Sequence, residues 1–339
     1  MKKIMIIITA ISIFISCGFK SKPSGIIYVE FGGNVGYYDF SKQKFIEKKW
    51  TSMGAGNLYD DFDISWDNKK ILLTLDVEGS FNFDERRYLL RNIKDDYNYK
   101  KLSDGKNIFD KIYTWGDISY MEAAISPDEK YIAVSAQHFA ELPLTIIDTS
   151  TGKEVSQWVD ESVGFLYYGK PLWTKDNTLY FRIGKTLYKC SSSDEYKKAV
   201  KVLDVGDASY ITVNPQGTKL AFRKNKHLWI ADIDGSNLKQ VTISETSGIT
   251  DYEGESMPVF SPDGKYIAFT SNGKRGAAWS DHDYPDGSYV SATGGKFGYL
   301  AVIPADGRLY DLRKKNSEVI ILKNSDGFNI PSTKVPIWR

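Results

Sequence analysis

Groups that could bind a ligand gather most densely in the run Trp279-Ser280-Asp281-His282-Asp283-Tyr284. Carboxylates and imidazoles hold cations, and aromatic faces stack on sugars or on basic side chains. The same run could equally be a solvated loop with local hydrogen bonds, because an Asp-His-Asp triplet is not in itself a metal-ligand spacing. We therefore predict a contact surface here, with no metal and no other cofactor.

No catalytic sequence motif accompanies this run. The chain lacks a GxSxG nucleophile turn, a phosphate-binding glycine loop, a CxxC pair and an HExxH helix. Catalysis by two carboxylates stays open, since it needs only two carboxyl groups that face each other within roughly 5 to 10 Å. The candidates for such a pair are Asp117, Asp160, Asp251, Asp281 and Asp283.

The elements that must position these groups come from one repeated unit, FSPDGKYIAFTS at residues 260–271. Pro262 pre-sets φ and Gly264 can take the left-handed conformation, so the unit predicts a hairpin. The run after the turn is apolar at nearly every position, which predicts a strand covered on both faces. Related turns recur every 40 to 61 residues, with left-handed positions predicted at Asn68, Glu129, Asn177, Gly217 and Gly264. Glu129 is the exception, because the other four adopt positive φ cheaply.

A period of roughly 40 to 50 residues built only from strands indicates the blades of a β-propeller. Each copy supplies four strands, and in the last copy residues 308–322 are expected to supply the third and fourth. The chain ends on a first-strand pattern, Val335-Pro336-Ile337-Trp338, whereas residues 25–48 lack a first strand. Joining the two ends gives a closed, all-β, six-bladed propeller of antiparallel blades. A β-sandwich is the alternative, but it predicts neither the period nor the matching ends.

The stretches SPDGKYIAFTS and NPQGTKLAFRKNKHLWIADIDGSNLKQVT resemble the WD-type β-propeller repeat of the TolB family. Similar repeats occur in the propeller domains of prolyl oligopeptidases. The resemblance covers residues 25–339 as architecture, with sharp motifs in three copies. Neither the domain that precedes the TolB propeller nor a hydrolase domain fits this sequence, so the resemblance implies a fold and not an activity.

The long connections are expected to share one face of the ring. In a propeller, links from a fourth strand to the next first strand lie on the same side as links between second and third strands. The longest departure from the repeat, residues 273–307, should project over this loop-rich face, with residues 288–292 and 297–303 as a small flap hairpin. Ligand contacts are predicted there at Trp115, His138, Tyr167, Tyr168, Tyr252, Trp279, Asp281, His282 and Tyr284.

The remaining histidine and the second cysteine have simpler expected roles. His138 and His282 could converge over the central channel, but His227 lies beside Leu228 and Trp229 and is expected to pack internally. A three-histidine metal site like that of some propeller lyases is therefore not predicted. Cys190 is expected to be a small buried hydrophobe.

Residues 1–17, MKKIMIIITAISIFISC, have two lysines, an apolar run and a small residue before a cysteine, which is typical of a secretory signal. The run is shorter than the ~20 apolar residues of a transmembrane helix. Ser16-Cys17-Gly18 resembles a bacterial lipoprotein processing site, which implies acylation of Cys17, although Phe14 stands where such sites usually have Leu. A plain cleaved signal and an uncleaved anchor are the alternatives. Residues 18–24 are then a tether and residues 25–339 the propeller.

Composition fits an exported globular protein, with 42% hydrophobic and 14% aromatic residues. A formal net charge of +1 gives no global field for nucleic acid. We therefore favour a monomeric, noncatalytic binding or scaffold protein, anchored in the lipid bilayer of a bacterial envelope and periplasmic or surface-exposed. Its loop-rich face would engage a protein, peptide or glycan. The alternative is an envelope or polysaccharide hydrolase or lyase with a carboxylate pair on that face.

Overall fold

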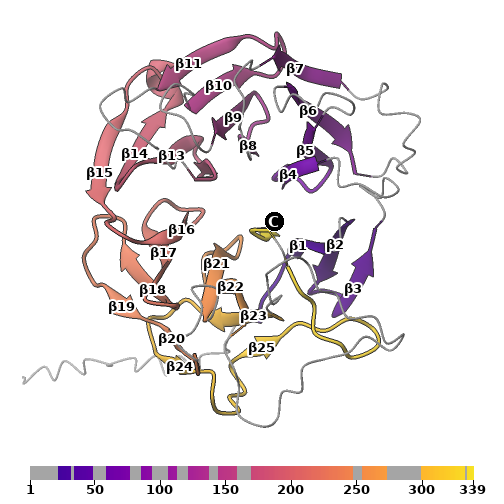
Figure 1. The fold of residues 1–339 in the computed structure, drawn as a ribbon, viewed down its shortest axis with the longest axis vertical. Helices are drawn as coiled ribbons and strands as arrows, with labels where there is room; N and C mark the ends of the chain where they lie inside the picture. The colour runs from indigo at the N-terminus through magenta and orange to yellow at the C-terminus, as the bar shows by residue number, and fades with distance from the viewer. Residues whose placement is uncertain are drawn as a thin grey trace, which may run out of the picture.

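The computed structural model describes residues 22–31, 34–48, 59–76, 85–93, 106–112, 121–136, 144–158, 169–246, 254–272, 299–332 and 334–339. In these ranges the chain is all-β, and antiparallel four-stranded sheets stand around a central axis like the blades of a propeller (Figure 1). The predicted β-propeller fold is confirmed. No helix in these ranges is long and apolar enough to cross a bilayer.

The strands follow one another around the ring, and each sheet is ordered from the axis outward (Figure 1). The sheet that joins the two ends contains β26 (Ile337–Trp338), β1 (Ile26–Phe31), β2 (Asn34–Asp39) and β3 (Lys44–Glu47). The next sheet contains β4 (Tyr59–Ile64), β5 (Lys70–Asp76), β6 (Glu85–Asn92) and β7 (Lys106–Ile112). The sheet after it contains β8 (Met121–Ile125), β9 (Tyr131–Ala136), β10 (Leu144–Asp148) and β11 (Glu154–Trp158).

The second half of the ring continues the pattern. One sheet contains β12 (Leu172–Trp173), β13 (Thr178–Ile183), β14 (Thr186–Ser191) and β15 (Val200–Asp204). The next contains β16 (Ser209–Val213), β17 (Lys219–Lys224), β18 (His227–Asp232) and β19 (Lys239–Gln240). The last contains β21 (Glu255–Phe260), β22 (Tyr266–Ser271), β23 (Tyr299–Pro304) and β25 (Ile320–Ile321).

The turn between the first and second strands of a sheet is closed by polar side chains of that turn. Ser261 Oγ donates to Asp263 Oδ1 (2.6 Å) and accepts from the Tyr266 N–H (2.9 Å). Hydroxyl-to-carboxylate bonds recur from Ser65 to Asp67, Ser126 to Asp128 and Thr174 to Asp176. The predicted left-handed residues Asn68, Glu129, Asn177, Gly217 and Gly264 have φ of 59°, 59°, 61°, 69° and 73°, so all five predictions are confirmed.

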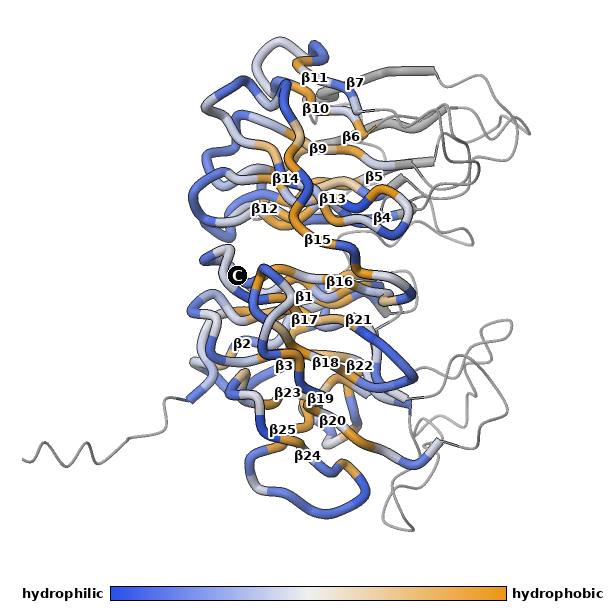
Figure 2. Tube along the Cα trace, turned by 90° about the vertical axis from the view of Figure 1, so that its left-hand side faces the viewer, coloured by the Kyte–Doolittle hydropathy of each residue, from blue (hydrophilic) through white to orange (hydrophobic). Residues whose placement is uncertain are grey.

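The core lies between neighbouring sheets as a series of apolar clusters. Leu228 and Ile230 of β18, for example, belong to one cluster with Ile267 and Phe269 of β22. Figure 2 shows the apolar residues along the strands and the polar residues in the turns between them. Each sheet is thus stabilised by burial against its neighbours, which makes the continuity of the ring important for stability.

The two ends of the described chain pair with each other. Ile27 lies opposite Trp338 and Tyr28 opposite Ile337 in an antiparallel pairing. The Ile26 N–H donates to Arg339 O (2.8 Å), and the Arg339 N–H donates to Ile26 O (3.0 Å). The predicted pairing of the final strand with the segment after the tether is confirmed.

The last sheet differs from expectation. Tyr299–Pro304 forms β23, which pairs with β22 along its whole length, so assigning these residues to a flap hairpin was wrong. Residues 308–322 do not supply the third strand either, because β24 (Tyr310–Asp311) pairs in parallel with β20 (Thr242–Ile243) of the preceding repeat. The physical reason is burial: β22 is buried at every position, and Leu300 to Ile303 offer it four consecutive buried apolar side chains. Residues 273–298 lie outside the described ranges.

Candidate functional site in the central channel

The contact residues predicted from sequence lie outside the part of the chain that the structure describes. This holds for Trp115, His138, Tyr167, Tyr168, Tyr252, Trp279, Asp281, His282 and Tyr284, and for Cys17. It also holds for the candidate carboxylates Asp117, Asp160, Asp251, Asp281 and Asp283. These assignments remain predictions.

Within the described ranges, polar groups converge in the central channel. The innermost strands β4, β8, β12, β16, β21 and β26 contribute residues to a cavity of about 110 Å³. Aromatic and proline side chains make much of its wall, among them Trp66, Trp173, Tyr210, Pro258 and Pro336. Its charged lining residues are Asp63, Glu122, Lys170, Arg182 and Arg339.

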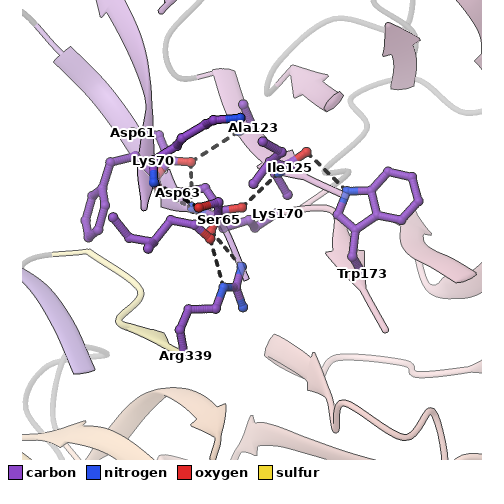
Figure 3. A network of polar contacts seen from close by, with 12 residues as sticks. Asp61, Asp63, Ser65, Lys70, Ala123, Ile125, Lys170, Trp173 and Arg339 are labelled. Carbon is purple, nitrogen blue, oxygen red and sulfur yellow. Dashed lines mark hydrogen bonds and ion pairs between the residues drawn. The ribbon is translucent and has the colours of Figure 1, made fainter. Parts of the chain in front are cut away.

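Two carboxylates of β4 connect this strand to β8. Asp61 and Asp63 alternate with Phe62, so they project from the same face of the strand. Asp61 Oδ2 accepts from the Ala123 N–H (3.2 Å), and Asp63 Oδ2 accepts from the Ile125 N–H (2.9 Å) (Figure 3). Both carboxylates are buried, and they satisfy amides of β8 that point away from its own sheet partner.

Two cations balance these buried carboxylates. Lys170 Nζ lies 2.8 Å from Asp61 Oδ2 and donates to Phe62 O (2.7 Å). Arg339 Nη2 lies 3.0 Å from Asp63 Oδ1, and Arg339 Nε donates to Ile64 O (2.8 Å) (Figure 3). Burial lowers the pKa of Arg339, and the Asp63 charge opposes that shift. Each of the four charges thus has a partner of opposite sign, which a buried charge requires.

Glu122 is the exception in this network. Its Oε2 atom is buried and has no hydrogen-bond partner among the described residues. Burial raises the Glu122 pKa to about 7, with a further contribution from Asp61, while Lys170 and Lys334 oppose the rise. Trp66 Nε1 is a second buried polar atom without a partner in the described part of the chain, and both residues line the cavity. Glu122 can therefore give or take a proton near neutral pH.

A second polar cluster lies between β18 and β21. Glu255 is fully buried, and its Oε2 lies 2.8 Å from His227 Nδ1 and accepts from Thr242 Oγ1 (2.9 Å). Its other oxygen accepts from Ser271 Oγ (3.2 Å). His227 is thus largely buried, as expected, but a carboxylate holds it. The cluster joins neighbouring sheets and was not predicted.

Cys190 is 3% exposed and lies in the cluster of apolar residues around Trp173 and Phe181. Burial raises its thiol pKa to about 12. The prediction of a small buried hydrophobe is confirmed. In the ranges that the structure covers, no three His, Cys, Asp or Glu side chains are grouped in a way that could hold a metal ion.

Comparisons with known proteins concern the fold. The family described as the dipeptidyl peptidase IV (DPP IV) N-terminal region matches residues 185–278. A putative TolB from Agrobacterium tumefaciens is 17% identical with a TM-score of 0.50, over 85% of this chain and 87% of that one. TolB from Acinetobacter baumannii is 16% identical with a TM-score of 0.57, over 93% of this chain and 66% of that one. The chain carries a TolB-like β-propeller domain.

This TolB-like propeller spans slightly less than two thirds of the Acinetobacter protein. A search of curated proteins found no match. An oligogalacturonate lyase in complex with manganese is also similar, at 15% identity over 74% of this chain and 72% of that one, but its TM-score of 0.47 supports no argument about activity. At such identities the likeness extends to the fold alone.

Proposed function

We propose that this TolB-like propeller is a noncatalytic binding or scaffold protein of the bacterial cell envelope. Acylated Cys17 holds it at the membrane, and its loop-rich face engages a protein, peptide or glycan. Each four-stranded sheet is one blade of a closed, six-bladed ring. The observation that carries this proposal is the pairing of the channel charges with one another between different sheets of the ring.

Those pairs commit four charged groups of the channel to the scaffold, and Glu122 stands outside them. Asp61 and Asp63 use their oxygens on β8 amides and on Lys170 and Arg339. These four groups are left with little capacity for turning over a substrate, whereas the same contacts hold inner strands in fixed positions. A rigid ring that presents variable connections is the usual arrangement of a binding scaffold.

Site-specific crosslinking tests the predicted contact surface. A photoreactive amino acid would replace Trp279 or Tyr284 and, as matched controls, the exposed turn residues Lys130 or Lys265. We expect a discrete crosslinked product in native cells from positions 279 and 284 only. Equal products from all four positions, or none from 279 and 284, would contradict the proposed surface.

Acylation has its own test. The full-length protein should incorporate a labelled fatty acid and partition into the detergent phase, and Cys17→Ser should do neither. The buried Cys190 serves as the internal control, because Cys190→Ser should leave labelling unchanged. Labelling of the Cys17→Ser protein would show that Cys17 is not the anchor.

A carboxylate-dependent hydrolase or lyase is the second candidate, favoured by Glu122, whose raised pKa and nearby Asp61 suit acid–base chemistry. Its test is the release of new chain ends from envelope polysaccharides by the wild-type protein and by Glu122→Gln. We expect no release from either. Release by the wild type that falls at least about 100-fold in the variant would favour the enzyme, since general acid–base catalysis typically contributes 10²–10⁴-fold.

A further inference from the structure

The point where the chain enters the propeller is fixed beside the C-terminal strand. Trp338 Nε1 donates to Ser24 O (2.8 Å), and the Ile26 N–H donates to Arg339 O (2.8 Å). Gly25 has a φ of +90°, and a Cβ there would lie 2.5 Å from Arg339 O. The backbone at residues 24–26 is therefore held at the gap, by which we mean the break in the chain between the end of β26 and the start of β1.

This gap belongs to one particular face of the ring. In the other sheets, a tight hairpin turn joins the first strand to the second, as at residues 65–70, 126–131, 174–178, 214–219 and 261–266. We call the end of the molecule that carries these hairpins the turn face. Neighbouring hairpins touch: Lys70 pairs with Glu129, the Asp128 N–H donates to Asn177 Oδ1 (3.3 Å), and the Lys175 N–H donates to Pro215 O (2.9 Å).

The entry point lies in this same circle of turns. Arg339 follows β26, and its guanidinium reaches Asp63 and Ile64 O at the end of β4, directly before the turn at residues 65–70. Because the gap between β26 and β1 takes the place of a hairpin turn, residues 22–25 leave from the turn face.

We infer that the turn face of the anchored protein lies against the lipid bilayer and that the loop-rich face is directed away from it. This inference rests on the acylation of Cys17 proposed above. Cys17 precedes Lys22 by only five positions in the sequence. At 3.3–3.6 Å per residue, these positions span at most about 18 Å even when fully extended.

That reach is too short to bring the lipid to the other face. Counted likewise from Lys22, which leaves from the turn face, the chain would have to cross at least two further strands, about 10 Å at a spacing of 4.7–4.9 Å. It would then have to follow a strand of six residues for about 20 Å. The route of about 30 Å exceeds the reach of about 18 Å, so the tether sets the orientation.

Surface charge on the turn face contributes little to this orientation. Lys69, Lys130 and Lys265 project from three turns with 73%, 71% and 61% of the side chain exposed. Each lies within 3.0 to 3.7 Å of a carboxylate in its own turn, Asp67, Asp128 or Asp263. Such exposed pairs leave little net charge for anionic lipid headgroups, so the orientation should be insensitive to salt.

Fluorescence resonance energy transfer from a fluorophore at one site on the protein to acceptor lipids in the membrane tests the orientation. Lys130→Cys and Lys265→Cys place a fluorophore on the turn face. Lys185→Cys and Asp207→Cys place it on the opposite face, since residue 185 follows β13 and residue 207 precedes β16. All four residues have exposed side chains, whereas Cys190 is buried, and the protein without an added cysteine is the blank.

The full-length acylated protein would be reconstituted in phosphatidylethanolamine–phosphatidylglycerol vesicles that contain an acceptor lipid. We expect about twofold higher transfer from positions 130 and 265 than from 185 and 207, because a six-residue strand separates the faces by about 20 Å. The ratio should persist in high salt. Equal transfer from both faces of a protein that carries the fatty-acid label overturns the orientation alone, whereas absence of the label overturns the anchor and the orientation together.

Discussion

At the scale of single residues, Arg339 is the most informative position for stability. Its partner Asp63 is 1% exposed, so Arg339→Ala leaves a buried carboxylate without its cation. We expect a loss of about 3–5 kcal/mol in the free energy of unfolding, the range typical for breaking one side of a buried ion pair. Urea denaturation of the variant and the wild type measures this loss.

Arg313→Ala is the matched control, because its partner Asp311 and the arginine itself are both partly exposed. Exposed pairs contribute about 0–1 kcal/mol. Similar small losses in both variants would contradict the structural role of Arg339.

Glu122 should make stability depend on pH. Its folded-state pKa is raised to about 7, above the ordinary value of 4.5, so the folded protein binds this proton more tightly than the unfolded chain does. The contribution of Glu122 to stability is therefore complete below pH 4.5 and is lost as pH rises through about 7. The expected fall is about 1–3 kcal/mol.

Denaturation midpoints of the wild type and Glu122→Gln, measured from pH 4.5 to 8, isolate this effect, because the amide does not ionise. The slope attributable to residue 122 should vanish in Glu122→Gln and remain in Glu245→Gln, which changes an exposed carboxylate. A wild-type slope that survives in Glu122→Gln would assign it to another group.

At the scale of elements, the turn before β18 and the start of β21 are locked together. Gly254 has a φ of +94°, and a Cβ there would lie 1.9 Å from Lys226 O. The Glu255 N–H also donates to Lys226 O (2.8 Å). Gly254→Ala should therefore cost about 2–4 kcal/mol, combining backbone strain with displacement of the neighbouring turn.

Gly206→Ala is the control for that substitution. Gly206 also has positive φ (+56°), but a Cβ at this position would meet no atom of a neighbouring segment within 4 Å. The change should cost only about 1 kcal/mol. Thermal unfolding of both variants gives the comparison, and equal losses would mean that the contact with Lys226 is unimportant.

The turns were predictable from sequence because their chemistry is local. Pro262 and Gly264 identify the hairpin without reference to the rest of the chain, and even Glu129 adopts the predicted left-handed conformation, with φ of 59°. The structure shows that Glu129 pairs with Lys70 of the preceding sheet. Such an ion pair between sheets is a long-range feature that the repeat pattern alone does not specify.

The channel network was not predictable in the same way. Asp61 and Asp63 occur in YDDFDI, a run whose charges suggest an exposed strand. Their cations Lys170 and Arg339 lie more than a hundred residues away, so only the closed ring brings the four together. The sequence feature that could have indicated this network is the alternation of Asp61 and Asp63 with Phe62 on the innermost strand of a sheet. The β20–β24 pairing likewise depends on contact between two repeats.

At the scale of the whole molecule, ring closure depends on a short strand anchored by one indole. Trp338 is 2% exposed, stacks on Phe40 with 5.3 Å between ring centroids, and donates to Ser24 O. Trp338→Ala should cost about 3–5 kcal/mol, as for other buried large-to-small substitutions. Because the loss falls on the closing sheet, opening should begin there.

Hydrogen exchange followed by mass spectrometry checks this prediction. Amides of β1 and β2 should lose protection in Trp338→Ala, while those of β17 and β18, on a different part of the ring, should keep most of theirs. A uniform loss of protection around the ring would show that the propeller opens as one cooperative unit.

The pairing of residues 26–28 with residues 337–339 also constrains how the protein is made. Residues 26–28 are synthesised long before residues 337–339, so their sheet stays incomplete until that later segment is available. In the export that we propose, the ring closes only after residues 337–339 have crossed the membrane. Contacts between such distant parts of a chain form slowly, and the waiting strands expose unpaired edges. A chaperone that covers these edges until residues 337–339 are available would therefore raise the yield of the closed ring.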